Sequence, residues 1–170
     1  LRNQITPKKE PKKMEQIDST DLRILSALQH NAKITNRELA AQVHLSQSSC
    51  LTRVRKLEQA KIITAYHARL DLNKLCRFVK CLVTVSISGQ TKEDSAAFQA
   101  HVESTPEILE CYTVSGAFDF LLKVVAPDMK SYLEVTDELI QAVDSQITLN
   151  THVVMEEVKA SREYPLGSLL

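Results

Sequence analysis

Residues 46–58, SQSSCLTRVRKLE, place short polar side chains ahead of a group of cations. In a helix, Cys50, Val54 and Leu57 fall on one side with Leu51 beside them, which makes an apolar stripe. The other faces carry the polar and cationic residues Ser46, Gln47, Ser48, Ser49, Thr52, Arg53, Arg55 and Lys56. Short polar groups and the free N–H groups of a helix N-terminus reach base edges and phosphates, while Arg and Lys bind phosphate oxygens or guanine. Alone, the stretch fits either a solvated helix that carries basic residues or a helix that enters the major groove of double-stranded DNA through these eight residues. The helix and turn before it and the charge of this half, described below, favour the DNA-binding helix.

Other chemistry is sparsely represented in the chain. The four cysteines, Cys50, Cys76, Cys81 and Cys111, include no C-x-x-C pair, and no histidine cluster completes a zinc set. We interpret them as small buried hydrophobic residues in a reducing compartment. The sequence has no nucleophile motif, no H-E-x-x-H and no phosphate-binding loop, so it predicts neither an enzyme nor a bound cofactor.

Two short helices are expected before the cationic one. The first follows Asp18, a good N-cap, and ends near His30–Asn31. A Ser/Thr-x-x-Glu capping box, Thr35–Glu38, opens the second. The apolar residues of both recur at helical spacing: Leu22, Ile24, Leu25, Leu28, Leu39, Ala40 and Val43. A tight turn at residues 44–45 leads to Ser46, the N-cap of the third helix, and this order predicts a helix-turn-helix.

Charge is distributed unevenly along the chain. The formal net charge is zero, but residues 1–70 hold 13 Lys and Arg against 6 Asp and Glu, a net of +7, and residues 71–170 carry −7. Such a split indicates that one half meets a polyanion and the other does not. The basic, proline-containing tail before Met14, itself a candidate natural start, is interpreted as a solvated arm that adds weak, salt-sensitive DNA affinity.

The second half alternates between strand and helix patterns. Strands are expected at residues 78–88, 108–114, 120–125 and about 147–158. Thr91 with Asp94 opens the first helix, Pro106 ends it, and Asp128 opens the second. Alternating strand residues and helically spaced residues are expected in the core: Val79, Cys81, Val83, Val85, Ile87, Phe98, Val102, Met129, Tyr132, Leu133, Thr136, Leu139 and Ile140. The order β-α-β-β-α-β predicts a ferredoxin-like sandwich with both helices on one face of an antiparallel sheet.

The expected fold class is α+β, a helix-turn-helix (winged-helix-like) domain followed by the ferredoxin-like domain. The expected boundaries are a basic tail at 1–14, the helix-turn-helix domain at 15–63, a linker strand at 64–76, the ferredoxin-like domain at 77–160 and a C-terminal tail at 161–170. Leu82, Leu122 and Val124, or their neighbours, are expected to point away from the helices. An apolar sheet face needs to be covered, and a second copy of the chain can cover it, so we predict a homodimer. A dimer also suits a helix-turn-helix, because two DNA half-sites lie about one helical turn apart.

Several stretches together resemble the Lrp/AsnC (leucine-responsive regulatory protein, or feast/famine) family, and most closely its leucine-responsive branch. They are IDSTDLRILSALQ, NRELAAQVHLSQSSCLTRVRKLE, VSGAFDFLLKV, APDMKSY and THVVMEEVK, and they span roughly residues 16–165. The resemblance implies an N-terminal DNA-binding domain and a C-terminal domain that senses amino acids. It also implies dimers that assemble into tetramers or octamers.

The resemblance further implies an effector site near a turn of pattern G-x-x-D between dimers, with a contribution from the last strand. The residues at matching positions are Ser115, Gly116, Ala117, Asp119 and Thr151. Gly116 would let backbone N–H groups approach a carboxylate, and Asp119 would pair with an α-ammonium group. The alternatives remain that Gly116 only serves the turn and that Asp119 only caps the hairpin.

The chain departs from the family pattern at three places. Ala32 and Ala60 stand where the family often has glycine after a helix, a position that favours a left-handed residue. Asn31 can take that conformation at the first site, and a modified cap or strain is expected beside Ala60. Leu149 stands where close relatives tend to have a polar residue, which leaves the identity of the effector open.

The function expected from these patterns is that of a cytoplasmic, nucleoid-associated transcriptional regulator whose DNA affinity or assembly responds to an amino acid such as leucine. No run approaches the roughly 18 apolar residues of a membrane span, so no membrane partner is expected. Two alternatives stay open. One is an enzyme resembling the sirohaem decarboxylases, which share this architecture, and the other is an architectural DNA-binding protein without an effector.

Overall fold

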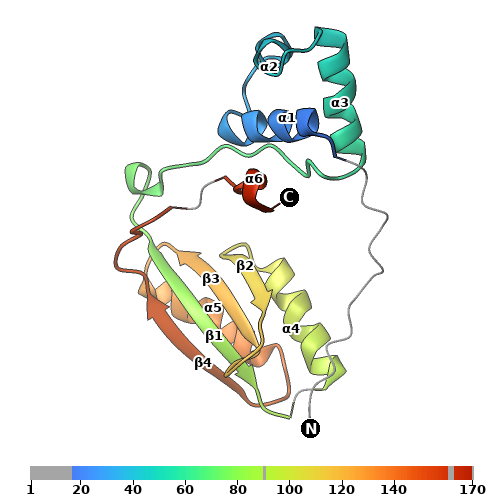
Figure 1. Ribbon diagram of the computed structural model, residues 1–170. Helices are drawn as coiled ribbons and strands as arrows, with labels where there is room; N and C mark the ends of the chain where they lie inside the picture. Colours follow the sequence, from blue (N-terminus) through green and yellow to red (C-terminus); the bar gives the residue numbers. More distant parts are fainter. Residues whose placement is uncertain (1–16, 90, 161–162, 170) are drawn as a thin grey trace. The chain divides into compact units, whose positions relative to one another are not determined.

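The computed structural model describes residues 17–89, 91–160 and 163–169, which form two compact units (Figure 1). The first unit contains the described residues up to Arg69 together with the C-terminal segment 163–169. The second unit runs from Leu70 to Ala160. The C-terminal segment, expected only as a tail, thus belongs to the same unit as the N-terminal helices.

The first unit is built on α1 (Ser19–His30), α2 (Asn36–Gln42) and α3 (Gln47–Gln59). Each helix begins at the N-cap that the sequence predicts, because Asp18, Thr35 and Ser46 all accept backbone N–H groups of the first turn. The core consists of Ile24, Ala27, Leu39, Ala40, Val43, Cys50 and Leu57. The prediction for Leu51 was wrong, since its side chain is 39% exposed on α3.

The two helix ends without glycine behave differently. Asn31 is extended, with φ −144°, so the predicted left-handed conformation there is wrong. Its side chain instead accepts the N–H of Lys33 at 3.0 Å, a local turn that Asn favours. After α3, Ala60 stays helical and Lys61 takes φ 61°, so a left-handed residue with a Cβ ends this helix. The expected modified, strained cap is confirmed one residue beyond Ala60.

The segment after α3 differs from its expected form. Residues 64–76 were predicted to form a linker strand, but they contain no strand, only a 3₁₀ turn at Leu72–Lys74. Strands need a partner for their backbone N–H and C=O groups, and within the described chain these residues pair with no strand of the sheet.

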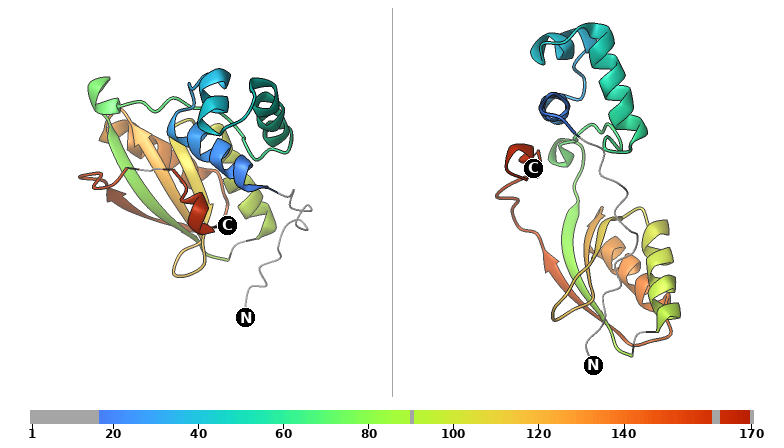
Figure 2. Two further views of the ribbon diagram at one scale, coloured as in Figure 1. Left: turned by 45° about the horizontal axis from the view of Figure 1, so that its top comes forward. Right: turned by 45° about the vertical axis from the view of Figure 1, so that its right-hand side comes forward.

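The second unit has the predicted order of elements. It consists of β1 (Val79–Ile87), α4 (Lys92–Ser104), β2 (Ile108–Thr113), β3 (Phe120–Ala126), α5 (Met129–Gln141) and β4 (Ile147–Val153). The strands form one antiparallel sheet in the order β2-β3-β1-β4. Both helices cover the same face of this sheet (Figure 2). The ferredoxin-like prediction is confirmed, although β4 ends at Val153 and not near residue 158.

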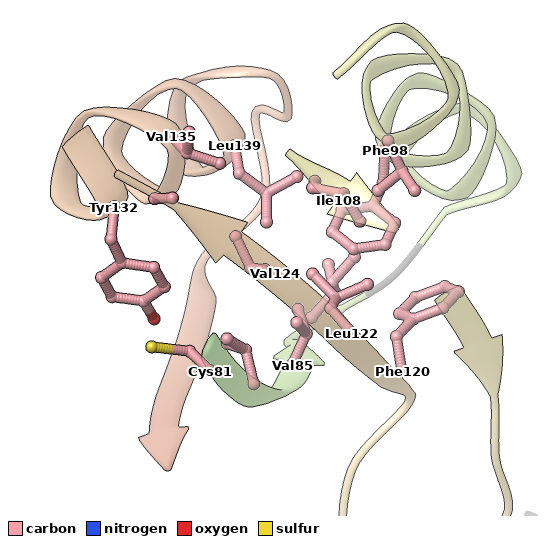
Figure 3. Close-up of a cluster of buried hydrophobic side chains, with 14 residues drawn as sticks. Cys81, Val85, Phe98, Ile108, Phe120, Leu122, Val124, Tyr132, Val135 and Leu139 are labelled. Atoms are coloured by element: carbon pink, nitrogen blue, oxygen red, sulfur yellow. The ribbon is translucent and has the colours of Figure 1, made fainter. Parts of the chain in front are cut away.

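The core of this unit lies between the sheet and its two helices (Figure 3). Phe98 of α4 and Phe120 of β3 meet there with ring centroids 4.5 Å apart. Replacing a buried phenylalanine with alanine typically costs about 3–5 kcal/mol, so this contact is a main source of stability. Alternate residues of β1 are buried as predicted: Cys81, Val83, Val85 and Ile87.

Some expected positions lie on other faces. Leu122 and Val124 are each 1% exposed and belong to the core, so their neighbours Leu121 and Val125 take the outward side of β3. On α5, the predicted core residues Met129, Leu133 and Ile140 are 42%, 53% and 43% exposed. Tyr132, Thr136 and Leu139 face the core as predicted, and so does Val135, which the sequence pattern missed. The buried stripe of α5 is narrower than the apolar stripe in its sequence, because the helix packs on the sheet along one side only.

Candidate DNA-binding and effector sites

The predicted DNA-contacting residues lie together on α3 and at its N-cap. Seven of the eight are exposed: Ser46, Gln47, Ser48, Ser49, Thr52, Arg55 and Lys56. Arg53 is partly covered. Because Cys50 and Leu57 bury the opposite side of α3, the hydroxyl-rich start and the two exposed cations face away from the core. This is the arrangement that a major-groove helix requires.

The start of α3 is held by a small network of hydroxyl groups. Ser46 Oγ accepts the N–H of Ser49 at 3.2 Å and donates to Ser49 Oγ at 2.9 Å. It also lies 3.1 Å from Ser48 Oγ. One residue that the sequence reasoning missed joins this region, because Asn36 Nδ2 of α2 donates to the carbonyl of Gln47 at 2.9 Å. This bond fixes the start of α3 against α2.

Arg53 has partners that its place in the sequence did not indicate. Its Nη1 donates to Asp18 Oδ2 at 2.7 Å and to Asp21 Oδ1 at 2.8 Å. Those two carboxylates also form the capping box of α1 with each other's backbone N–H groups. The backbone N–H of Asp21 and the guanidinium of Arg53 lower the pKa of Asp18, and Asp21 and Asp18 raise the pKa of Arg53. Arg53 therefore ties α3 to the first turn of α1.

A shallow depression of about 530 Å³ follows this side of α3. Its lining combines two carboxylates with the hydroxyls and cations of the helix: Asp18, Asp21, Ser48, Ser49, Thr52, Arg53 and Lys56. Two carboxylates beside a phosphate backbone would repel it. Their ion pairs with Arg53 neutralise part of this charge.

The predicted effector loop lies between β2 and β3. Ser115, Gly116 and Ala117 are exposed, and Gly116 has φ +138°, a conformation that favours glycine. A Cβ built on Gly116 would meet no atom within 4 Å, so the backbone of the turn is open to a ligand.

Asp119 closes this loop onto the end of β1. Its Oδ2 accepts the N–H of Ile87 at 2.9 Å, and its own N–H donates to Val85 at 2.8 Å. The Asp119 side chain thus has a structural role, because it joins the start of β3 to the end of β1 and not the two strands of the hairpin. A ligand ammonium group would have to share this carboxylate with the backbone of β1.

Thr151 lies away from the loop in the same protomer. It sits on β4 opposite Val83, and β1 separates β4 from β3. Its hydroxyl bonds to the hydroxyl of Tyr132, whose side chain is buried and whose pKa is raised by that burial. Leu149, the departure from the family pattern, packs against the core on the same strand. The loop residues are brought together, and Thr151 is not brought to them within one chain.

Two other kinds of site can be checked in the described part of the chain. Among residues 17–89, 91–160 and 163–169, no three His, Cys, Asp or Glu side chains gather to hold a metal ion. Within the same ranges, no helix is long and apolar enough to cross a membrane.

Comparison with known proteins relates both units to characterised families. Residues 17–64 match the winged helix-turn-helix DNA-binding family, and residues 80–164 match the Lrp/AsnC ligand binding domain. The leucine-responsive regulatory protein of Salmonella typhimurium is 38% identical over 92% of this chain and 94% of its own length. That of Escherichia coli K12 is 37% identical over the same shares.

Solved structures agree with this relationship over nearly their whole length. The transcriptional regulator NMB0573 of Neisseria meningitidis, solved with L-Met, has a TM-score of 0.82 at 35% identity and covers 90% of this chain and 99% of its own. An AsnC family transcriptional regulator from Agrobacterium tumefaciens has a TM-score of 0.81 at 31% identity over the same shares. The chain belongs to the Lrp/AsnC family of transcriptional regulators, with a DNA-binding helix-turn-helix and a C-terminal ligand-binding domain.

Proposed function

We propose that this protein is a cytoplasmic, nucleoid-associated regulator that binds double-stranded operator DNA through α3 and responds to an amino acid. The observation that carries the proposal is the exposed face of α3 and its N-cap. Seven of the eight predicted contact residues are exposed there, five of them short polar residues and two of them cations. In this proposal Ser46, Gln47, Ser48, Ser49 and Thr52 approach bases and phosphates, while Arg55 and Lys56 bind the phosphate backbone. Arg53 acts through its ion pairs, by orienting α3.

The proposed effector is a free amino acid bound at the loop Ser115–Asp119. Leucine and methionine are the first candidates, because related regulators are named for one and solved with the other. The exposed turn at Gly116 supplies backbone N–H groups for the α-carboxylate, and Asp119 supplies an acceptor for the α-ammonium group. Since Thr151 lies two strands from this loop, a pocket that uses both is completed between protomers.

The proposed assembly begins with a homodimer through the uncovered face of the sheet. The outward side chains there mix apolar groups with paired charges: Lys80, Leu82, Tyr112, Leu121, Lys123 and Val125. Lys123 pairs with Glu110 at 2.9 Å and Lys80 with Glu157 at 3.3 Å, which reduces the cost of covering them. Dimers then associate into tetramers or octamers around the effector loops.

Sedimentation velocity tests the dimer. Leu82, 39% exposed at the middle of β1, should not tolerate a charge if this face is covered, so Leu82→Arg should produce monomers. Leu133→Arg places the same charge on the exposed side of α5 and is the control, expected to leave the dimer intact. A Leu82→Arg protein that sediments as the wild-type dimer contradicts the proposed interface.

DNA affinity measured with and without amino acids tests the effector. Leucine or methionine should change the dissociation constant for operator DNA, with the same concentration of glutamate as control. Coupling in allosteric proteins is typically about 5- to 150-fold, so a partial change is expected rather than a complete switch. Equal affinity in every amino acid would support the architectural alternative instead.

A further inference from the structure

The C-terminal segment 163–169 packs on the DNA-binding unit, beside the end of α1. The side-chain amide of Gln29 makes two hydrogen bonds to the backbone of Tyr164, accepting its N–H at 2.9 Å and donating to its carbonyl at 3.4 Å. The neighbouring His30 Nδ1 lies 3.0 Å from Glu163 Oε1. The side-chain amide of Gln29 thus pairs with the backbone N–H and C=O of Tyr164, as the backbone of a neighbouring strand would. These bonds do not involve the Tyr164 side chain.

An apolar pocket of about 390 Å³ continues this contact surface. Leu25 and Leu28 of α1 line it from one side, and Ile62 and Ile63 line it from the segment after α3. Leu166 begins the short helix α6 (Leu166–Leu169) and enters the lining as a half-buried side chain. Leu166 is therefore part of the wall of this pocket, together with Leu25, Leu28, Ile62 and Ile63, and we call this group of five apolar side chains the apolar seat.

The contact is suited to release. Tyr164 and Leu169 are 74% and 63% exposed, so Leu166 is the main apolar contact of the described segment. The polar contacts of the described segment are the two hydrogen bonds between Gln29 and the backbone of Tyr164 and one exposed His30–Glu163 pair. Exposed ion pairs of this kind contribute little to stability. A segment held by so few groups can detach while both units stay folded.

We propose that residues 163–169 are a clasp through which the ligand-binding unit controls the DNA-binding unit. The chain leaves the DNA-binding unit once, before Leu70, and returns to it after Ala160, so two covalent connections join the units. The second connection follows β4, the strand that carries Thr151. A ligand that shifts the end of β4 then acts on α1 through the docked segment, and α1 holds α3 through Arg53. This inference rests on the amino-acid response proposed above.

Two variants of the full chain test the clasp. Gln29→Ala removes both hydrogen bonds to Tyr164, and Leu166→Asp places a charge in the apolar seat. Gln99→Ala, the same substitution on the exposed side of α4, is the control. Amide hydrogen exchange of the C-terminal peptide, followed by mass spectrometry, reports docking without any effector. Faster exchange in both variants, with no change in the control, is expected; unchanged exchange in both overturns the docking.

Fluorescence anisotropy on operator DNA, with and without leucine or methionine, reports the coupling. Both variants should bind DNA without effector as wild type does, while the effector-induced change in affinity falls to within about twofold of none. A full effector response in both variants overturns the clasp as a control element. A wild-type protein that responds to neither amino acid contradicts the proposed effector instead, and the exchange result then decides whether the segment docks.

Discussion

Arg53 Nη1 lies 2.8 Å from Oδ1 of Asp21, so α3, the proposed DNA-contacting helix, is joined to α1 by an ion pair. The Asp21 side chain is only 12% exposed, and the second partner, Asp18, caps the same helix. A basic residue on a recognition helix is usually interpreted as a phosphate contact. Here its position makes it a link between two helices, and the two roles predict different salt dependence.

Replacing Arg53 with alanine should weaken DNA binding without changing its salt dependence. The variant leaves the carboxylates of Asp18 and Asp21 unneutralised beside the DNA surface and loosens α3, but removes no phosphate contact. Arg55→Ala is the comparison and should lower the slope of log K against log salt by about one. Both slopes come from anisotropy titrations over a salt series. A flattened slope in Arg53→Ala would show that Arg53 binds phosphate.

Ser46→Ala should destabilise the DNA-binding unit by about 1 kcal/mol, the typical value of an N-cap side chain. The bond that is lost runs from the N–H of Ser49 to Ser46 Oγ. Ser26→Ala, on the exposed side of α1, is the control and should have little effect. Urea unfolding followed by circular dichroism measures both. Equal stability of Ser46→Ala and wild type would mean that the cap contributes nothing.

Asp119→Asn separates the two roles of this carboxylate. The amide keeps an oxygen for the N–H of Ile87 but loses the charge that an α-ammonium group needs. We expect a stable protein that binds DNA and has lost its effector response, whereas Asp119→Ala should also be destabilised by about 1–3 kcal/mol. Thermal unfolding and DNA binding with effector distinguish the two variants. An intact response in Asp119→Asn rules out charge pairing at this residue.

The DNA-binding unit should lose stability at high pH through Tyr66. Tyr66 is 47% exposed, and partial desolvation of its side chain, together with its hydrogen bond to Glu58 at 2.9 Å, raises its pKa from 10.0 to about 12. Because the folded pKa lies above the unfolded one, this contribution is complete below pH 10 and is lost as pH rises to about 12. The pKa of Tyr132 is also raised by burial, so tyrosinate absorbance should show late-titrating tyrosines, one of which is missing in Tyr66→Phe. The same titration curve in both proteins contradicts this assignment.

Much of the fold follows from local signals in the sequence. The N-caps at Asp18, Thr35, Ser46, Thr91 and Asp128 and the alternation along β1 identify the elements because each has a short-range physical cause. The side of α5 that faces the core depends on how the helix packs, so Met129 and Leu133 were misplaced.

At the candidate sites, too, contacts between distant parts of the chain could not be predicted from local sequence patterns. Sequence spacing identifies the exposed face of α3, but the partners of Arg53 come from residues 32 and 35 positions away in the chain. Likewise, nothing local links Gln29 to Tyr164, which lie 135 positions apart. Contacts of this kind depend on the folded chain, and they change the roles assigned to individual side chains.

The most direct test of the central claim is fluorescence anisotropy of the full chain on DNA from upstream of its own gene and on a scrambled duplex, at about 150 mM salt. Sequence-specific binding through α3 predicts clearly tighter binding to the upstream duplex, with the preference reduced by Ser48→Ala. Equal affinity for the two duplexes, or binding to neither, would contradict it.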